Sequence, residues 1–247
     1  MSTLPEIGDL EERARELRKR VLDLSLETKE GHLPGCFSEI EILLSLYNRV
    51  LKEEDKFILS KGHCCLPYYL LLRERGYNPK ITMHPDIDVK NGIHCTTGSL
   101  GHGLPIGVGM AFARKFQRRN GRIFVLVGDG ECEEGTTYES ALLASAYKLD
   151  NLHLIIDNNK LQALEKLVLP INFKNNFESF GWQVKEVEGH SFSELIPELD
   201  RTYSGKPHVI IAHTIKGKGV SYMENNAEWH ARKPSPEILK GAYEELK

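Results

Sequence analysis

The sequence has few cysteines, and none of them is spaced as a metal-binding or redox pair. The five are Cys36, Cys64, Cys65, Cys95 and Cys132, an odd number without a CxxC motif or any secretory context. This favours free thiols over disulfide bridges or a zinc site. We assign Cys132 no function and attribute it to packing or chance, because the sequence offers no evident base that would activate its thiol.

Long apolar runs and an excess of one charge are also absent. The chain carries 32 Lys and Arg residues against 35 Asp and Glu residues, a net charge of −3, which gives no reason to expect nucleic acid as a partner. Residues 1–28 form a charged amphipathic pattern without the apolar stretch of a signal peptide, and no later segment resembles a membrane span. We therefore expect a soluble cytoplasmic protein without a membrane partner.

No Pro/Ser/Gly-rich linker or internal repeat divides the 247 residues (28.0 kDa), so one large α/β domain is expected. Apolar runs alternate with segments of helical periodicity, which predicts an open, mostly parallel sheet with helices on both faces. A capping box at Ser38 and Glu41 is expected to start a helix that reaches Val50. The expected strands span residues 57–59, 123–127, 152–159, 182–187 and 208–214. The other expected helices span residues 66–75, 104–116, 136–149, 191–201 and 235–246.

The tripeptide Gly128-Asp129-Gly130 ends one apolar run, and Asn159 ends the next, thirty residues after Asp129. The helical segment between the runs makes this a strand–helix–strand unit. A right-handed crossover makes such strands parallel and adjacent, so Asp129 and Asn159 should meet at the carboxyl edge of the sheet, where ligands of open α/β sheets bind. The glycines let the backbone approach a phosphate closely, and the following helix directs its positive end to the same place.

The same residues suit a magnesium ion. Mg²⁺ prefers six oxygen ligands and usually takes one or two from protein carboxylates, while phosphate and water supply others. Asp129 offers a carboxylate, Asn159 an amide oxygen and Leu161 a backbone carbonyl. A lone Gly-Asp-Gly is more often an ordinary strand-to-helix turn, but the partner thirty residues later favours a diphosphate and metal site.

A second glycine-rich segment, TGSLGHG at 97–103, precedes the expected helix at 104–116. Its amides suit a phosphate or a flat ring, although tight helix packing explains the glycines equally well. Histidines gathered around one cleft would suit hydroxyl binding and proton transfer, whereas a single loop histidine is usually only solvated. The histidines at loop or element ends are His32, His63, His84, His102 and His230, and we assign no role to His94, His153, His190 or His208.

Taken together, these motifs resemble the amino-terminal, diphosphate-binding domain of transketolases. The similarity extends from the Gly31-His32 turn to His230 and so covers most of the chain. The motifs that carry it are Gly31-His32, SKGH at 60–63, His84-Pro85, TGSLGHG at 97–103, GDGECEEG at 128–135, YKLDNL at 147–152, DNN at 157–159 and IAHTIKGKGVSYMENNAEWH ending at His230.

The resemblance implies thiamine diphosphate as the cofactor, held with Mg²⁺ or Ca²⁺. The implied metal ligands are Asp129, Asn159 and the Leu161 carbonyl. The implied cofactor-binding residues are His63, Gly98, Ser99, Leu100, Gly128, Asp129, Gly130, Glu134, Asn159, Leu161 and His213. Glu134 also matches an acid of the network that links paired active sites in the family. The implied catalytic residues, which would hold the hydroxyls of the sugar donor and move protons, are His32, His63, His84 and His230.

The implied reaction transfers a two-carbon ketol unit from a ketose phosphate to an aldose phosphate, as in the pentose phosphate pathway, with the cofactor as electron sink. A full-length transketolase continues beyond the position of Lys247 into a pyrimidine-binding domain, which supplies the glutamate that activates the cofactor. We therefore expect residues 1–247 to be a single diphosphate-binding domain. The pyrimidine-binding domain is expected on a partner chain, in a heterotetramer, and the chain alone is expected to be inactive.

Several positions depart from the family pattern. His102 replaces a usual Gln, Ala231 replaces a usual Gly, Cys64-Cys65 replace small residues, and residues 162–166 replace a short Asp-Gly turn beside the cofactor. Four alternatives therefore stay open. They are the alpha subunit of a 2-oxoacid dehydrogenase, which lacks SKGH and TGSLG; deoxyxylulose-phosphate synthase, whose glycine motif differs; a split relative in sulfosugar or secondary metabolism; and a non-catalytic cofactor-binding subunit.

Overall fold

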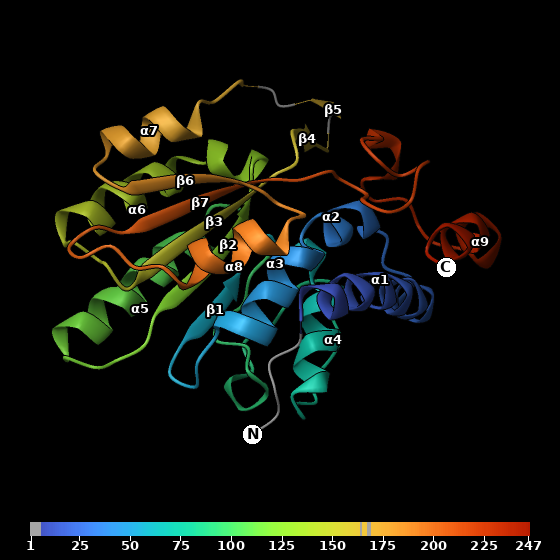
Figure 1. The fold of residues 1–247 in the computed structure, drawn as a ribbon, viewed down its shortest axis with the longest axis horizontal. Coiled ribbons are helices and arrows are strands. Elements are labelled where there is room, and N and C mark those ends of the chain that lie inside the picture. Colours follow the sequence, from blue (N-terminus) through green and yellow to red (C-terminus); the bar gives the residue numbers. More distant parts are fainter. Residues whose placement is uncertain (1–5, 164, 167–168) are drawn as a thin grey trace.

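A parallel β-sheet forms the centre of the protein (Figure 1). The computed structural model describes residues 6–163, 165–166 and 169–247, and within them five strands form this sheet in the order β1-β2-β3-β7-β6. The strands are β1 (Lys56–Leu59), β2 (Ile123–Gly128), β3 (Leu152–Asn158), β6 (Gln183–Glu188) and β7 (His208–His213). A separate antiparallel hairpin pairs β4 (Leu161–Gln162) with β5 (Glu165–Lys166).

Helices cover both faces of the sheet, so the predicted fold class is confirmed. On one face lie α1 (Ile7–Thr28), α2 (Leu33–Ser38), α3 (Ile40–Ser45), α4 (Leu66–Glu74) and α8 (Phe192–Asp200), with α9 (Pro236–Glu245) packed beside α1. On the other face lie α5 (Gly103–Phe116), α6 (Gly135–Ala146) and α7 (Phe173–Ser179).

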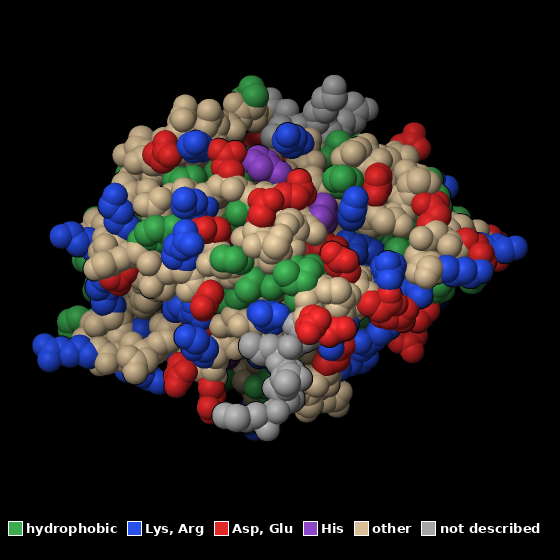
Figure 2. Space-filling view, in the orientation of Figure 1, with side chains coloured by type: hydrophobic (Ala, Val, Ile, Leu, Met, Phe, Trp, Pro, Cys, Tyr) green, Lys and Arg blue, Asp and Glu red, His purple; other side chains and the backbone are tan. Residues whose placement is uncertain are grey.

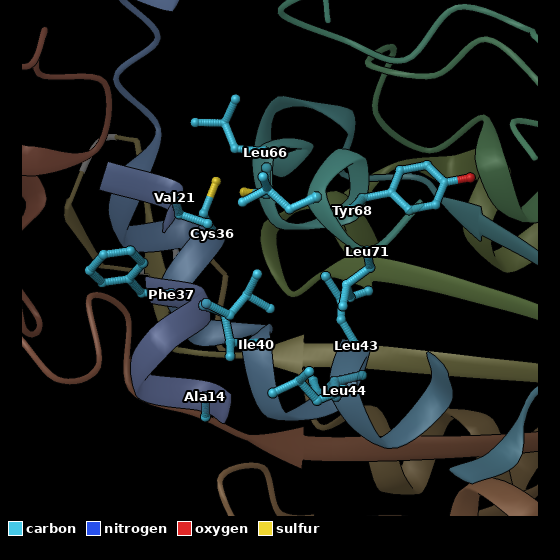
Figure 3. Packing of buried hydrophobic residues seen from close by; sticks show 14 of the residues in the cluster. Ala14, Val21, Cys36, Phe37, Ile40, Leu43, Leu44, Leu66, Tyr68 and Leu71 are labelled. Atoms are coloured by element: carbon cyan, nitrogen blue, oxygen red, sulfur yellow. The ribbon is translucent and has the colours of Figure 1, made fainter. Parts of the chain in front are cut away.

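Two hydrophobic cores result from the alternation of side chains along the strands. In β2, Phe124 and Leu126 point into the core under α1–α4 and α8, while Val125 and Val127 point into the core under α5–α7. Figure 3 shows the first core, where Val21 of α1, Phe37 of α2 and other apolar side chains of α3 and α4 pack together. Both faces of each central strand are therefore buried, which explains the continuous apolar runs in the sequence.

The predicted strands end within one residue of the observed ones, and the predicted helices after residue 60 end within three. The apolar stripe predicted in the amino-terminal segment is also confirmed, since α1 buries Leu10, Ala14, Leu17, Val21 and Leu24. Strong periodicity and clear helix ends, such as Pro236 at the start of α9, carried these predictions.

The predicted capping box at Ser38 and Glu41 is wrong. Ser38 ends α2, and its hydroxyl donates to the Gly35 carbonyl at 3.0 Å and to the Asp157 carboxylate at 2.6 Å. Glu41 instead accepts hydrogen bonds from the buried Arg18 guanidinium, the nearest at 2.8 Å. Both polar side chains are used in contacts between distant segments, which outweigh the local capping pattern.

Neither α7 nor the β4–β5 hairpin was predicted from the sequence. An N-cap starts α7, because the Asn172 side chain accepts a hydrogen bond from the Asn175 N–H at 3.0 Å. Residues 162–166, which depart from the family pattern, belong to this hairpin, except that Leu164 lies outside the described residues.

The distribution of surface charge and the state of the cysteines agree with the expectations from the composition. Figure 2 shows acidic and basic side chains interspersed on the visible face, without a large area of one charge. All five cysteines are free, as predicted, and all are buried, with Cys132 in the core under α5–α7. None of the described helices is both long enough and apolar enough to cross a membrane.

Two histidines are buried side by side in the sheet. His153 of β3 and His208 of β7 are register partners, with ring centroids 5.6 Å apart. Burial lowers the pKa of both rings, helped at His153 by His208 and Arg122, and that of His208 falls to about 4. The His153 ring also stacks on Phe124, and Tyr203 lies against His208. Both histidines are therefore neutral in the folded chain at neutral pH.

These histidines should make the fold sensitive to mild acid. An unfolded histidine takes up a proton near pH 6.5, while the folded His208 does so only near pH 4, so stability is lost as pH falls between these values. We expect wild type to lose on the order of 2 kcal/mol between pH 7 and 5 through His208, and a further loss in the same direction through His153. Urea unfolding at both pH values should show a smaller loss for His208→Leu, and an equal loss in both proteins would contradict this.

Candidate functional site

A pocket of about 390 Å³ opens at the carboxyl edge of the sheet. Its lining brings together most of the predicted site residues, from segments that are far apart in the sequence. The lining residues are His32, Gly35, Lys61, His63, Gly98, Leu100, Gly128, Asp129, Gly130, Glu131, Asn159, Leu161, Gln162, Ala163, Lys216 and His230. This is the edge at which ligands of parallel α/β sheets bind.

The ends of β2 and β3 meet at the pocket as the strand–helix–strand unit predicts. One oxygen of the Asp129 carboxylate accepts the Gly130 N–H at 2.7 Å, and the other accepts the Lys160 N–H at 2.5 Å. Asn159 lies next to Lys160, and its side-chain oxygen accepts the Leu161 N–H at 3.2 Å. Lys160 has a left-handed backbone (φ 62°), a strained conformation for a residue other than glycine and one often found at functional sites.

The Lys216 side chain completes this part of the pocket, and the sequence analysis assigned it no role. Its ammonium is buried and donates to the Leu161 carbonyl at 2.7 Å and to Nδ1 of His230 at 2.8 Å. Burial lowers the pKa of Lys216, while the Asp129 charge opposes this shift. The only available signal was its place in the TIKGKG segment that contributes to the family resemblance.

The donor set fits a hard divalent cation. Asp129, Asn159 and the Leu161 carbonyl supply oxygens at neighbouring points of one pocket, and Leu161 already binds the Lys216 cation. Burial and the neighbouring Asp157 raise the pKa of Asp129 to about 6, so its charge is poorly compensated by the protein. The described residues contain no cluster of three His, Cys, Asp or Glu side chains suited to a metal. The metal assignment thus rests on one carboxylate, one side-chain amide oxygen and one backbone carbonyl, and stays a prediction.

Three predicted histidines form the opposite part of the pocket. The rings of His32, His63 and His230 lie with their centroids 5.3 to 5.9 Å apart. Burial lowers the pKa of His32 and, together with Lys216, lowers that of His230 to about 4. The buried Nδ1 of His32 has no hydrogen-bond partner. A polar ligand group in the pocket would satisfy this nitrogen.

Four predicted site residues do not belong to the described lining. The His84 ring packs behind Gly98, where φ is 116° and an added Cβ would lie 2.5 Å from the ring. Ser99 is exposed beside His102, and Glu134 packs against Gly101 at the start of α6. His213 lies in a different hollow, with Nε2 2.9 Å from Glu186 and Nδ1 3.2 Å from Asn158. Their assigned roles stay predictions.

A buried ion pair forms the floor beneath the pocket. Lys61 is 2% exposed, and its ammonium donates to Asp157 at the end of β3 and, at 3.2 Å, to the Gly35 carbonyl of α2. Burial alone would raise the pKa of Asp157, but Lys61 and hydrogen bonds from Ser38 and Thr214 hold it below its usual value.

A second carboxyl group lies beside this ion pair. One oxygen of Glu39 is 3.2 Å from the Lys61 nitrogen, without hydrogen-bond geometry, and neither oxygen has a hydrogen-bond partner. Burial raises the pKa of Glu39 well above its usual value, so its neutral form is favoured. Lys61 therefore compensates the single charge of Asp157.

The β4–β5 hairpin borders the pocket through Gln162 and Ala163, as expected for the 162–166 departure. The Gln162 amide donates to the Glu133 carboxylate at 2.7 Å, which ties the hairpin to the turn after β2. The hairpin therefore shapes the pocket on the side of Asp129.

Comparisons with known proteins agree with this geometry. A family model described as the transketolase thiamine diphosphate-binding domain matches residues 11–237. The chain is 40% identical to one subunit of the apulose-4-phosphate transketolase of Actinobacillus succinogenes, covering 97% of this chain and 96% of that protein. It is 34% identical to the 6-deoxy-6-sulfo-D-fructose transketolase subunit SqwG of Clostridium sp. (strain MSTE9), with 96% of each covered.

Among solved structures, the transketolase of Campylobacter jejuni superposes with a TM-score of 0.85 at 28% identity. The match covers 98% of this chain but 43% of that one, so the chain spans less than half the length of that protein.

Replacing Lys61 by methionine should strongly destabilise the chain. The substitution leaves the buried Asp157 carboxylate without its counter-charge, which typically costs about 3–5 kcal/mol. Lys115→Met is a matched control, because Lys115 forms an exposed ion pair with Asp150 and should contribute less than about 1 kcal/mol. Urea unfolding measures both effects, and a Lys61→Met midpoint equal to that of the control would contradict the assignment.

Proposed function

Because the chain belongs to the family of transketolase thiamine diphosphate-binding domains, we propose that it is the diphosphate-binding subunit of a split transketolase. The resemblance identified from its sequence motifs is confirmed. The proposed reaction moves a two-carbon ketol unit from a ketose phosphate to an aldose phosphate. One observation carries this proposal: a single pocket combines the oxygens of Asp129 and Asn159 with three neighbouring histidine rings.

Thiamine diphosphate, when bound, would supply the electron sink for breaking and forming the carbon–carbon bond. We assign its diphosphate to the side of the pocket formed by Gly128, Gly130 and the Lys216 ammonium. Asp129, Asn159 and the Leu161 carbonyl would hold Mg²⁺ or Ca²⁺ there. Gly98 and Leu100 would line the other side of the cofactor. The roles of Ser99, Glu134 and His213 belong to the same proposal, but rest on the family resemblance alone.

The histidines would bind the sugar and move protons. Nδ1 of His230 accepts a hydrogen bond from the Lys216 ammonium, so the neutral ring carries its proton on Nε2 and donates from there. His32 offers its unpartnered Nδ1, and the His63 ring lies beside both the His32 and the His230 ring. These groups suit the hydroxyls of a ketose donor, with His84 in the layer behind Gly98.

We propose that a partner subunit carries the pyrimidine-binding domain. The chain covers 96% of the Actinobacillus relative, which is named as a transketolase subunit, but 43% of the single-chain Campylobacter jejuni transketolase. This supports residues 1–247 as one diphosphate-binding domain whose active site needs the second chain. The five free thiols support a cytoplasmic location.

Exposed apolar side chains on α5 and α6 support assembly with a second copy of this chain. They are Ile106, Phe112 and Phe116 of α5, Leu142 and Leu143 of α6, and Tyr147 directly after α6. The ring of Phe112 contacts those of Phe116 and Tyr147, so the surface is continuous across both helices. Glu134 directly precedes α6, and Arg118 and Arg119 follow α5, so an antiparallel arrangement of two copies would match the acidic start of α6 with the basic end of α5. Two copies joined here, each with a partner, form the proposed heterotetramer.

A sulfonated ketose is the second candidate donor. The Clostridium relative is named for a sulfofructose substrate and the Actinobacillus relative for apulose 4-phosphate. Comparing kcat/KM for pentose phosphates, apulose 4-phosphate and sulfofructose in the reconstituted enzyme would distinguish these donors and test a role in the pentose phosphate pathway.

The purified chain should show no ketol transfer until a pyrimidine-binding transketolase subunit from the same cells is added. In the family, the pyrimidine-binding domain supplies the glutamate that activates the cofactor, and we propose that the second subunit carries this domain. We expect activity to appear only in the mixture, with light scattering reporting two copies of each chain. Measurable transfer by the single chain would contradict the proposal.

Gly128→Ala should weaken cofactor binding without harming the fold. An added Cβ at Gly128 meets no atom within 4 Å, and Gly128 lines the pocket, so the methyl group would occupy ligand space only. We expect thiamine diphosphate to bind the reconstituted complex at least about tenfold more weakly, as measured by calorimetry, with an unchanged urea midpoint.

Gly8→Ala is the matched control, because its added Cβ also meets no atom and Gly8 lies at the exposed start of α1. Equal cofactor affinity for Gly128→Ala and Gly8→Ala would place the diphosphate elsewhere.

A further inference from the structure

We propose that Glu131 is a positioning residue that sets the spacing of the glycine loops around the diphosphate, an inference that rests on the proposed function for the identity of the ligand. The Glu131 carboxylate is buried, and 2% of the residue is exposed. It lies in the short turn Gly130–Glu133 directly after Asp129. The sequence analysis assigned it no role.

Three loops donate hydrogen bonds to this one carboxylate. Its Oε1 accepts the Ser60 hydroxyl of the SKGH loop and the Gly101 N–H of the TGSLGHG loop, the latter at 2.9 Å. Its Oε2 accepts the Gly128 N–H of the GDG turn at 3.2 Å. The Ser60 oxygen in turn accepts the Gly103 N–H at 3.0 Å, at the first residue of α5. The donors come from segments up to 71 residues away in the sequence.

These hydrogen bonds lie behind the loops that face the ligand. Gly98 and Leu100 line one side of the pocket and Gly128 and Gly130 another, while Glu131 joins the two loops through neighbouring amides. The hydrogen bonds of Asp129 go instead to Gly130 and Lys160. In the turn after β2, Asp129 therefore belongs to the proposed metal site, while Glu131 fixes the distance between the two glycine loops.

A carboxylate suits this position because both of its oxygens accept hydrogen bonds. Among the described residues no Lys, Arg or His forms an ion pair with Glu131. Burial raises the pKa of Glu131, and the hydrogen bonds from the loops, with a smaller contribution from His63, oppose this shift and stabilise the carboxylate. Both oxygens are engaged, which leaves the group to position the loops rather than to react. A glutamine of the same shape has one acceptor oxygen, and its amide nitrogen only donates. Either orientation of that amide faces an N–H of Gly101 or Gly128, which then loses its partner.

Glu131→Gln tests this role in the complex of the chain with its partner subunit. We expect thiamine diphosphate to bind about tenfold more weakly, as measured by calorimetry, because one buried amide is left without an acceptor. At saturating cofactor, kcat should fall much less than the affinity, and KM for the sugar should stay near that of wild type. Glu178→Gln, at an exposed position of α7, a helix outside the proposed contact between copies, is the control for the loss of a single negative charge.

Amide hydrogen exchange on the chain without cofactor provides a second, independent readout. Peptides covering 97–103 and the end of β2 should exchange faster in Glu131→Gln than in Glu178→Gln, while peptides from β3 and β7 should not change. Wild-type exchange in both loops together with wild-type cofactor affinity would overturn the positioning role. A wild-type complex that binds no thiamine diphosphate would refute the proposed function instead, and the exchange rates would still decide the role of Glu131.

Discussion

The buried ion pair between Lys61 and Asp157 is the interaction on which the site depends. It joins the loop after β1 to the end of β3, and the same ammonium holds the Gly35 carbonyl of α2. Three segments that are distant in the sequence are thereby fixed at one point below the pocket. The segment after β1 also carries His63, the segment after β3 carries Asn159, and α2 follows His32, so the two sides of the pocket share a common floor.

The charges above this floor explain why a divalent cation and an anionic cofactor belong together. Asp129 is buried, and its pKa is raised. Of the two lysines in the described lining, Lys61 is paired with Asp157, whereas Lys216 binds the Leu161 carbonyl. A diphosphate bound without a cation would be repelled by the Asp129 carboxylate. A cation bound without a diphosphate would leave the glycine N–H groups without hydrogen-bond acceptors. Bound together they would neutralise each other, the carboxylate and the amides, which is the common arrangement for diphosphates on α/β sheets. On the opposite side, His32 and His230 have lowered pKa values, so they add hydrogen-bonding groups without adding charge.

Much of this arrangement follows from the sequence, because parallel strands impose it. Two apolar runs, with Asp129 and Asn159 at their ends, predict adjacent strands and a site at their carboxyl edge, and the structure places these residues there. Side chains that act across the fold were not predictable in this way. Ser38 follows the pattern of a helix cap but binds Asp157, and Glu131 and Lys216 carry no local signal for their partners 71 and 55 residues away. His213 carries a family-based role, yet its described contacts are to Glu186 and Asn158.

Native mass spectrometry of the tagged chain, isolated from its own cells, tests the central claim most directly. The account predicts a complex with two copies of this chain, two copies of a second protein of transketolase type, and bound thiamine diphosphate with a divalent metal ion. A stable assembly of this chain alone, without cofactor, would contradict the claim that it is the diphosphate-binding half of a split transketolase.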